Sequence, residues 1–223
     1  SAGDRLAILE RPTFGVDQPV DAGHFRTGGG APNAPAHVGP VVISEIMYHP
    51  ADGAGEYLEI VNRSDVPVSL HAPGEPARPW RLVGGVSYQF PTGLVLGPGQ
   101  RVVVAGVDPQ EFRVAAGMPV SATVLGPFVG RLDNAGEALR LVEPWTTAPG
   151  GQSGLNLTVD AVAYGPRSPW PVAADGRGPS LERRELGLYG AEPTHWTALG
   201  PGGTPGEPGP LVRRLWLPLV AIE

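Results

Sequence analysis

Short apolar runs separated by glycine and proline recur along most of this chain. They are rich in Val, Ile, Leu and aromatic side chains, and they fall at residues 41–48, 57–61, 80–83, 86–90, 94–96, 101–105, 128–132, 138–142, 159–164 and 181–185. Turn-forming residues lie between consecutive runs, as expected for short strands. The pattern predicts an all-β fold, an antiparallel β-sandwich of about seven to nine strands. A βαβ fold would need a helix after each strand, and because only one helical segment is predicted, this fold class is disfavoured.

The clearest hairpin signal lies at residues 80–90. Gly84 and Gly85 separate two strand-like runs there, and both positions can take the positive φ that tight hairpin turns require. Residues 101–105 form a nearly continuous apolar run. Such a run predicts a strand buried on both faces or placed centrally in a sheet.

One segment predicts a short helical connection. Asp108 is a natural N-cap, Pro109 suits the first helical position, and Glu111 completes a pattern similar to a capping box. Gly117 should end the helix after about two turns. We expect this helix to connect the sheets without forming a layer of its own.

Composition and charge exclude several function classes. Gly and Pro number 33 and 27 of the 223 residues, a share that can indicate a disordered chain. The regularly spaced apolar runs instead favour short strands separated by turns. Cysteine is absent, which excludes disulfides and thiolate metal sites. The formal charge is −6, every cation is an arginine, and no basic stripe is present. We therefore expect no nucleic-acid partner.

The chain divides by composition into three parts: residues 1–40, 41–208 and 209–223. The first part ends in a Gly/Pro linker and includes a strand-like run at residues 6–9. The second ends in the Gly/Pro-rich run 200–208, where we expect regular structure to stop. The third is an apolar C-terminal tail, too short for a transmembrane segment, which needs about 20 apolar residues.

Residues 1–40 resemble a fragment of the following domain. Leu-Glu-Arg followed by a His-aromatic pair and a Gly run occurs at residues 9–30 and again at residues 181–203. The match predicts a remnant of a preceding repeat, although Gly/Pro linkers also resemble one another. An orphan strand at residues 6–9 should pair with a sheet edge, in its own domain or in a neighbouring molecule.

The stretch from residue 42 to 62 resembles the opening of bacterial lamin-tail domains. Its motifs are VISEIMYHP at 42–50 and GEYLEIVN at 55–62. Further motifs follow in order: WRL at 80–82, LGPGQ at 96–100, LDNAGE at 132–137, WP at 170–171, ADGRGPSLER at 174–183 and GTPG at 203–206. The run at residues 71–79 lengthens the connection before Trp80. The resemblance spans about residues 41–208 and implies an immunoglobulin-like sandwich.

The same resemblance implies a role in binding and supplies no catalytic residues. Domains of this kind are interaction modules, found in bacteria within exported multi-domain proteins. We therefore expect a non-catalytic interaction or spacer module of a larger exported protein, secreted or at the cell surface, whose partner is a protein or a cell-envelope glycan. The alternative is an accessory domain of an exported hydrolase that binds carbohydrate or positions the substrate. Residues 214–220 resemble a short sorting tail.

The motifs of common enzymes are missing. No G-x-S-x-G sequence occurs, and the five histidines are scattered singly without metal-ligand spacing. Glu56 and Glu59 flank a predicted strand near Glu45, but glycosidase chemistry needs two carboxyls at a set separation in a cleft. We expect neither an enzyme nor a resident cofactor.

Calcium is the one ion that the sequence suggests. Asp133, Asn134 and Glu137 crowd one turn, Asp52 and Glu56 crowd another, and Asp175 lies in a third. Hard cations bind several oxygen ligands from loops. Asp and Asn also dominate turns because they bond their own main chain, and we favour this second interpretation.

Tryptophans supply the candidate binding residues. Trp145 and Trp170 lie beside prolines in predicted loops, where exposed rings stack on sugars or anchor a partner. Trp80 and Trp196 are expected to fill the core, with His195 packed beside Trp196.

Overall fold

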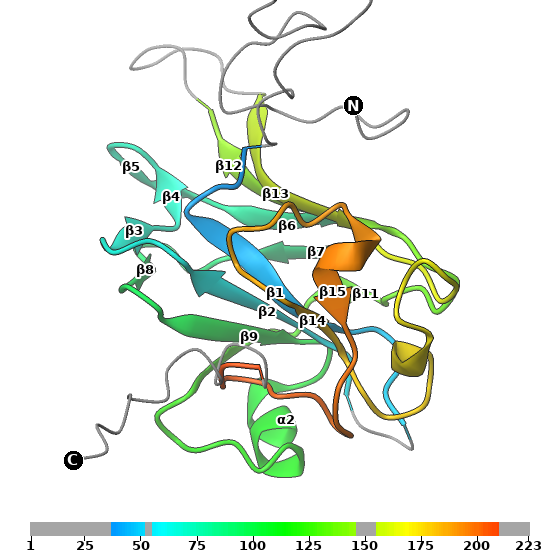
Figure 1. The fold of residues 1–223 in the computed structure, drawn as a ribbon. Coiled ribbons are helices and arrows are strands. Elements are labelled where there is room, and N and C mark those ends of the chain that lie inside the picture. The colour runs from blue at the N-terminus through cyan, green and yellow to red at the C-terminus, as the bar shows by residue number, and fades with distance from the viewer. Residues whose placement is uncertain (1–36, 52–54, 146–154, 210–223) are drawn as a thin grey trace, which may run out of the picture. The chain divides into compact units, whose positions relative to one another are not determined.

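The computed structural model describes residues 37–51, 55–145 and 155–209, almost all of them in the second of two compact units, Gly39–Glu223. Two β-sheets pack face to face and enclose the main hydrophobic core (Figure 1). The predicted all-β sandwich with one short helical connection is confirmed. The predicted strand at residues 6–9 lies outside the described residues, as does the tail from residue 210 onward.

The first sheet has six strands in the order β10-β9-β2-β1-β14-β15. Their bounds are Val41–Met47 (β1), Tyr57–Asn62 (β2), Arg101–Ala105 (β9), Thr123–Leu125 (β10), Leu181–Arg183 (β14) and Trp196–Thr197 (β15). The apolar run at β9 lies inside this sheet, as its composition predicts. β10 pairs with β9 in parallel, which departs from the antiparallel expectation because a helical crossover returns the chain in the same direction.

The second sheet has five strands in the order β11-β7-β6-β12-β13. Their bounds are Arg81–Gly84 (β6), Val86–Gln89 (β7), Val129–Gly130 (β11), Ala138–Pro144 (β12) and Asn156–Ala163 (β13). Two small ribbons pair β3 (Val68–Ser69) with β8 (Val95–Leu96) and β4 (His71–Ala72) with β5 (Glu75–Pro79). The run before Trp80 thus forms a hairpin, and two-residue strands raise the strand number above the predicted seven to nine.

The hairpin and the helix form where the sequence predicts them. β6 pairs with β7 through Arg81 opposite Gln89, but of the two turn glycines Gly84 alone takes a positive φ, +127°. The helix α2 spans Pro109–Ala115, and the Asp108 carboxylate accepts from the main-chain N–H groups of residues 110 and 111 at 2.8 and 3.1 Å. Gly117 follows with φ +63°. These caps satisfy the free donors and carbonyls at both helix ends.

Alternation along the six-stranded sheet gives it two buried faces. Leu58, Ile60 and Val104 point into the main core between the sheets. Tyr57 and Val103, one residue away in each strand, join a second apolar cluster with Phe112 and Met118. Helix α2 therefore covers the outer face of this sheet, as Figure 1 shows.

Trp170 belongs to the main core, so the expectation of an exposed loop tryptophan is wrong for this residue. Its exposed fraction is 6%, and its ring centroid lies 6.1 Å from that of Trp196. A turn beside Pro171 brings the ring inward, where burying a large aromatic surface is favourable. Trp80 and Trp196 also lie in the core, at 3% and 1% exposure, as expected.

A buried ion pair joins the two sheets at the β1–β13 side. Arg183 Nη1 of β14 donates to Asp160 Oδ2 of β13 at 2.7 Å, and both side chains are almost fully buried. The same carboxylate accepts from Ile43 N of β1 at 2.9 Å, while Arg183 donates to the Ile43 carbonyl at 3.1 Å. The pair thus satisfies main-chain groups of β1 as well as its own charges.

Replacing Asp160 by Asn should strongly destabilise the domain. The change leaves the Arg183 guanidinium buried without a counter-charge, which costs about 3–5 kcal/mol when one partner of a buried pair is lost. Denaturant unfolding at neutral pH measures the effect. Arg140→Ala, at an exposed position of β12, should change the unfolding free energy by less than about 0.5 kcal/mol. Equal stability of Asp160→Asn and wild type would contradict this account.

Candidate functional site

A cleft of about 500 Å³ lies where several loops meet at one end of the sandwich. Its lining comes from segments far apart in sequence and includes Tyr48, His49, Glu56, Val107, Arg131 and Asn134. We call it the loop-end cleft. Parts of three motif stretches, at residues 48–50, 55–56 and 134, are brought together here, as is typical of binding loops on a rigid scaffold.

Polar side chains of the loop-end cleft have defined partners. His49 Nδ1 lies 2.7 Å from Asp175 Oδ1, so the acidic residue predicted in a third turn orients the histidine. Glu56 Oε2 accepts from Leu132 N at 2.9 Å, and its other oxygen lies 3.7 Å from Arg131 Nε. The Arg131 side chain is 87% exposed. The cleft thus offers an arginine fork at its rim above a fixed carboxylate.

The floor of the cleft contains a buried tyrosine. Tyr48 is fully buried, and its ring centroid lies 4.7 Å from that of Tyr164. Its hydroxyl has no hydrogen-bond partner among the described residues. Burial, with the nearby charge of Asp175, raises the pKa of Tyr48 to about 12, so the phenol stays neutral.

The predicted calcium turn uses its oxygens internally. Asp133 Oδ1 accepts from Ala135 N at 2.8 Å, and Glu137 Oε1 accepts from Asp133 N and from the Tyr164 hydroxyl at 3.2 and 3.1 Å. Asn134 alone of the three lines the cleft. Across the described ranges, no three His, Asp or Glu side chains are grouped as metal ligands. These contacts support the turn interpretation, and calcium binding stays a prediction.

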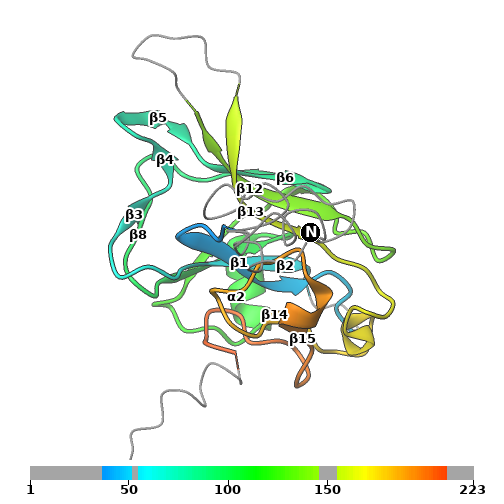
Figure 2. The ribbon, with the colours of Figure 1, turned by 45° about the horizontal axis from the view of Figure 1, so that its top comes forward.

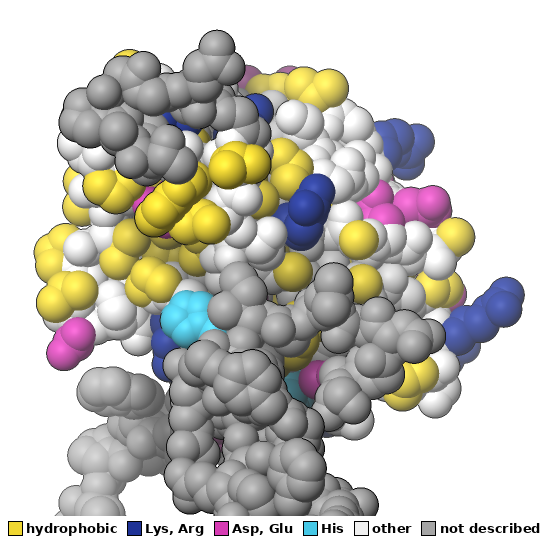
Figure 3. All heavy atoms as spheres, turned by 90° about the horizontal axis from the view of Figure 1, so that it is seen from above, with side chains coloured by type: hydrophobic (Ala, Val, Ile, Leu, Met, Phe, Trp, Pro, Cys, Tyr) yellow, Lys and Arg dark blue, Asp and Glu magenta, His cyan; other side chains and the backbone are white. Residues whose placement is uncertain are grey.

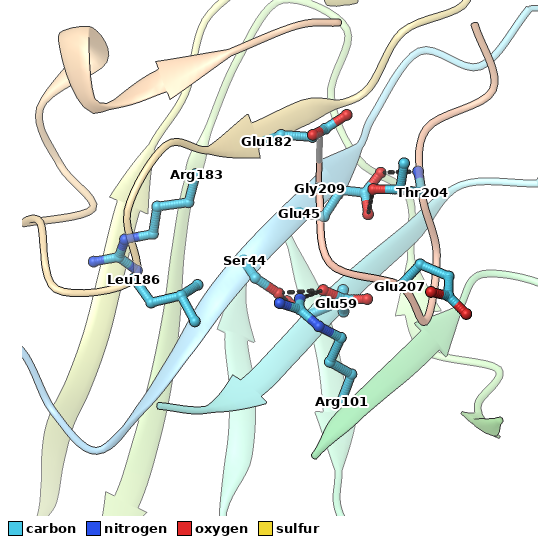
Figure 4. A pocket seen from close by; sticks show the side chains of 10 residues that line it. All are labelled: Ser44, Glu45, Glu59, Arg101, Glu182, Arg183, Leu186, Thr204, Glu207 and Gly209. Atoms are coloured by element: carbon cyan, nitrogen blue, oxygen red, sulfur yellow. Dashed lines mark hydrogen bonds and ion pairs between the residues drawn. The ribbon is translucent and has the colours of Figure 1, made fainter. Parts of the chain in front are cut away.

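Three glutamates form a buried row on the outer face of the six-stranded sheet (Figure 4). Glu59 of β2, Glu45 of β1 and Glu182 of β14 are directly opposite one another in register, and their exposed fractions are 1%, 2% and 4%. We call them the glutamate row. Like charges directly opposite on adjacent strands destabilise a sheet, so the row depends on its surroundings.

Glu59 and Glu45 are surrounded by donors. Glu59 accepts from the Ser44 hydroxyl at 2.5 Å and pairs with the Arg101 guanidinium. Glu45 accepts from the hydroxyls of Tyr57 and Ser180, both at 2.5 Å. Burial nevertheless raises the pKa of both carboxyls, that of Glu59 to about 7 with Arg101 opposing the rise.

Glu182 is the member of the row without sufficient partners. Its Oε1 is buried and makes no hydrogen bond to any described residue, and the side chain lines a cavity of only about 10 Å³, room for one water molecule. Burial and the charges of Glu45 and Glu59 raise the pKa of Glu182 to about 8. Near neutral pH this carboxyl therefore holds a proton.

The segment after β15 covers this row, and as expected it forms turns and no helix or strand. We call residues 201–209 the C-terminal strap. Thr204 N donates to Glu45 Oε1 at 2.7 Å, and Gly206 N donates to Glu59 Oε2 at 2.8 Å. The sequence interpretation assigned no role to Glu182 or to the strap. The available signal was alternation, because Glu59 lies between Leu58 and Ile60, which face the core.

Trp145 remains the exposed tryptophan among the described residues. It is 44% exposed where the far ends of β12 and β13 extend beyond the sandwich, as Figure 2 shows. Leu155 and Leu157, at 65% and 41% exposure, lie in the same projecting hairpin. Trp145 and the loop-end cleft are thus separate candidate surfaces.

The absence of a nucleic-acid partner stays a prediction. Arginine side chains visible in Figure 3 lie apart from one another and form no continuous stripe. None of the described helices is long and apolar enough to cross a membrane.

Comparison with known proteins identifies one family. The family model described as Lamin Tail Domain matches residues 34–165, more than half of the chain. No curated protein matches the sequence.

The glutamate row predicts that the domain is more stable in mild acid than in mild base. Because the folded pKa values of Glu59 and Glu182 lie above the ordinary 4.5, their contribution is full below pH 4.5 and is lost as the pH rises through about 7 and 8. Glu182→Gln mimics the protonated carboxyl. It should raise Tm at pH 9 by about 3 °C or more and reduce the slope of Tm against pH.

Thermal unfolding between pH 5 and pH 9 measures this difference. Glu185→Gln, three residues away at an exposed position, is the matched control and should follow the wild-type curve. A Glu182→Gln variant that is as pH-dependent as wild type would show that Glu182 does not titrate in this range.

Proposed function

The chain belongs to the lamin tail domain family, and from this premise we propose that it is a non-catalytic interaction or spacer module of a larger exported bacterial protein, secreted or displayed at the cell surface. The family is immunoglobulin-like, and membership in it supports a role as an interaction module. The compartment, the source and the larger parent protein are part of the proposal.

The observation that carries the proposal is the loop-end cleft. Its strands and turns are fixed by internal hydrogen bonds, such as that from Leu132 N to Glu56, while Arg131 remains largely exposed at the rim. An exposed guanidinium beside Asn134 offers several donors to one ligand. This arrangement supports recognition of a partner that presents carboxylate, carbonyl or hydroxyl oxygens.

The chemistry of the cleft favours binding over turnover. His49 and Asp175 resemble two members of a catalytic triad, but no serine, threonine or cysteine is among the described residues that line the cleft. A triad needs a nucleophile within hydrogen-bond reach of the histidine. We propose a protein as the partner. Binding to an isolated glycan would favour the accessory domain of an exported hydrolase instead.

The first test is co-sedimentation of the purified chain with envelope fragments. We expect binding, and we expect Arg131→Ala combined with Asn134→Ala to weaken it about tenfold or more, since an arginine that anchors a partner costs about 1–2 kcal/mol or more when truncated. Arg140→Ala combined with Gln89→Ala removes one guanidinium and one amide from exposed positions of the five-stranded sheet. This control should bind as wild type does. Equal binding by both double variants would exclude the cleft as the contact surface.

Calcium removal tests the acidic turn separately. Because the oxygens of Asp133 and Glu137 accept internal hydrogen bonds, we expect a chelator to change neither the Tm of the chain nor its sedimentation with the fragments. Differential scanning calorimetry with and without millimolar calcium measures the first. A rise in Tm with calcium that Asp133→Asn abolishes would establish a calcium site at this turn.

A further inference from the structure

The C-terminal strap is held to the domain partly through the glutamate row and partly through Gly202 N, which donates to the Gly178 carbonyl at 2.9 Å. Its main-chain N–H groups at Thr204 and Gly206 donate to Glu45 and Glu59. Figure 4 shows the strap passing over the row, with Thr204 beside Glu45. These bonds are charge-assisted and lower the pKa of both carboxyls, but burial has the larger effect and raises it.

Close approach of the strap depends on a glycine. Gly203 has φ +70°, and a Cβ at this position would overlap the Tyr57 hydroxyl, the Glu45 carboxylate and the Ser180 hydroxyl. Gly202, next to it, also has a positive φ, +83°, but a Cβ there would meet nothing within 4 Å. An alanine at either position would be strained by the positive φ, but only at Gly203 would its Cβ also overlap other atoms. The two glycines therefore form a matched pair for mutation.

The strap also covers apolar surface. Together with α2 it borders a groove of about 550 Å³ whose floor includes Met47, Tyr57 and Phe112. A Cβ at Gly206 would lie 2.8 Å from the Met118 methyl group. Detachment of the strap would therefore expose both the carboxylates and part of the second apolar cluster.

The charges that face the row are unbalanced. The titratable or charged groups around it are Glu45 on β1, Tyr57 and Glu59 on β2, Arg101 on β9, Glu182 and Arg183 on β14, and Glu207 on the strap. Arg183 pairs with Asp160 on the other side of the sheet. Among the described residues, Arg101 is thus the one cation paired with the row, and three ionised glutamates would leave it with a net negative charge.

We propose that the C-terminal strap is a proton-controlled latch, closed over the glutamate row while the row retains a proton and released when the row is fully ionised. Released glutamates regain water and ionise at lower pH, so closing the latch takes up protons and rising pH opens it. The raised pKa values of Glu59 and Glu182, about 7 and about 8, place the change between pH 6 and pH 9. This device is independent of the loop-end cleft.

Hydrogen exchange of the full chain between pH 6 and pH 9 tests the latch. After correction for intrinsic exchange rates, the protection of the Thr204 and Gly206 amides should fall about tenfold or more across this range, since each proton lost in opening contributes up to a factor of ten per pH unit. Amides of β2 and β9 should keep their protection. Glu182→Gln should keep the strap protected at pH 9.

The glycine pair distinguishes local release from loss of the whole fold. Gly203→Ala should leave the strap unprotected at every pH while β2 stays protected. Gly202→Ala, which adds the backbone strain without the overlap, should lose much less protection and keep the pH dependence. Constant protection at residues 204 and 206 from pH 6 to pH 9 would overturn the proposal. So would an equal loss of protection in β2, or an unchanged pH dependence in Glu182→Gln.

Discussion

The ion pair between Asp160 and Arg183 is the contact on which the outer face of the sandwich depends. It lies between the sheets and binds both main-chain groups of Ile43. Those groups are available because β1 has a bulge there, where the pairing register with β2 shifts between Ile43 and Glu45. A bulge leaves an extra residue outside the regular ladder, and the ion pair supplies the partners that the ladder does not.

The bulge decides where the glutamates point. Side chains alternate along a strand, so in a regular β1 Glu45 would share the inward face of Ile43. One extra residue, Ser44, reverses this parity, and Ile46 enters the core instead. Glu45 then faces outward in register with Glu59 and Glu182. The sheet and the strap bury these carboxylates, so the carboxylates need polar partners. Arg101, the surrounding hydroxyls and the main-chain donors of the strap supply them.

Local signals predicted the local structure well. The α2 caps and the Gly84 turn depend on neighbouring residues alone, and apolar runs mark the strands wherever burial is two-sided. What sequence could not provide was the set of contacts between distant segments. Nothing near Glu182 indicates that two other carboxylates lie opposite it, and a Gly/Pro-rich strap without apolar periodicity reads as a linker. Trp170 was misplaced for the same reason, since its burial depends on Trp196.

The bulge has a consequence for how such domains diverge. The most recognisable motifs of the chain, around residues 42–50 and 55–62, contain the bulge and two of the three glutamates, so much of them serves the fold, while His49 and Glu56 within them also line the cleft. Val107 and Arg131, which also line the cleft, lie outside every motif, so this part of the rim is free of the constraint on the bulge. Selection can therefore preserve the sandwich while the recognition surface drifts. Descendants of one ancestral domain would inherit its architecture intact, and each lineage would acquire its own partner.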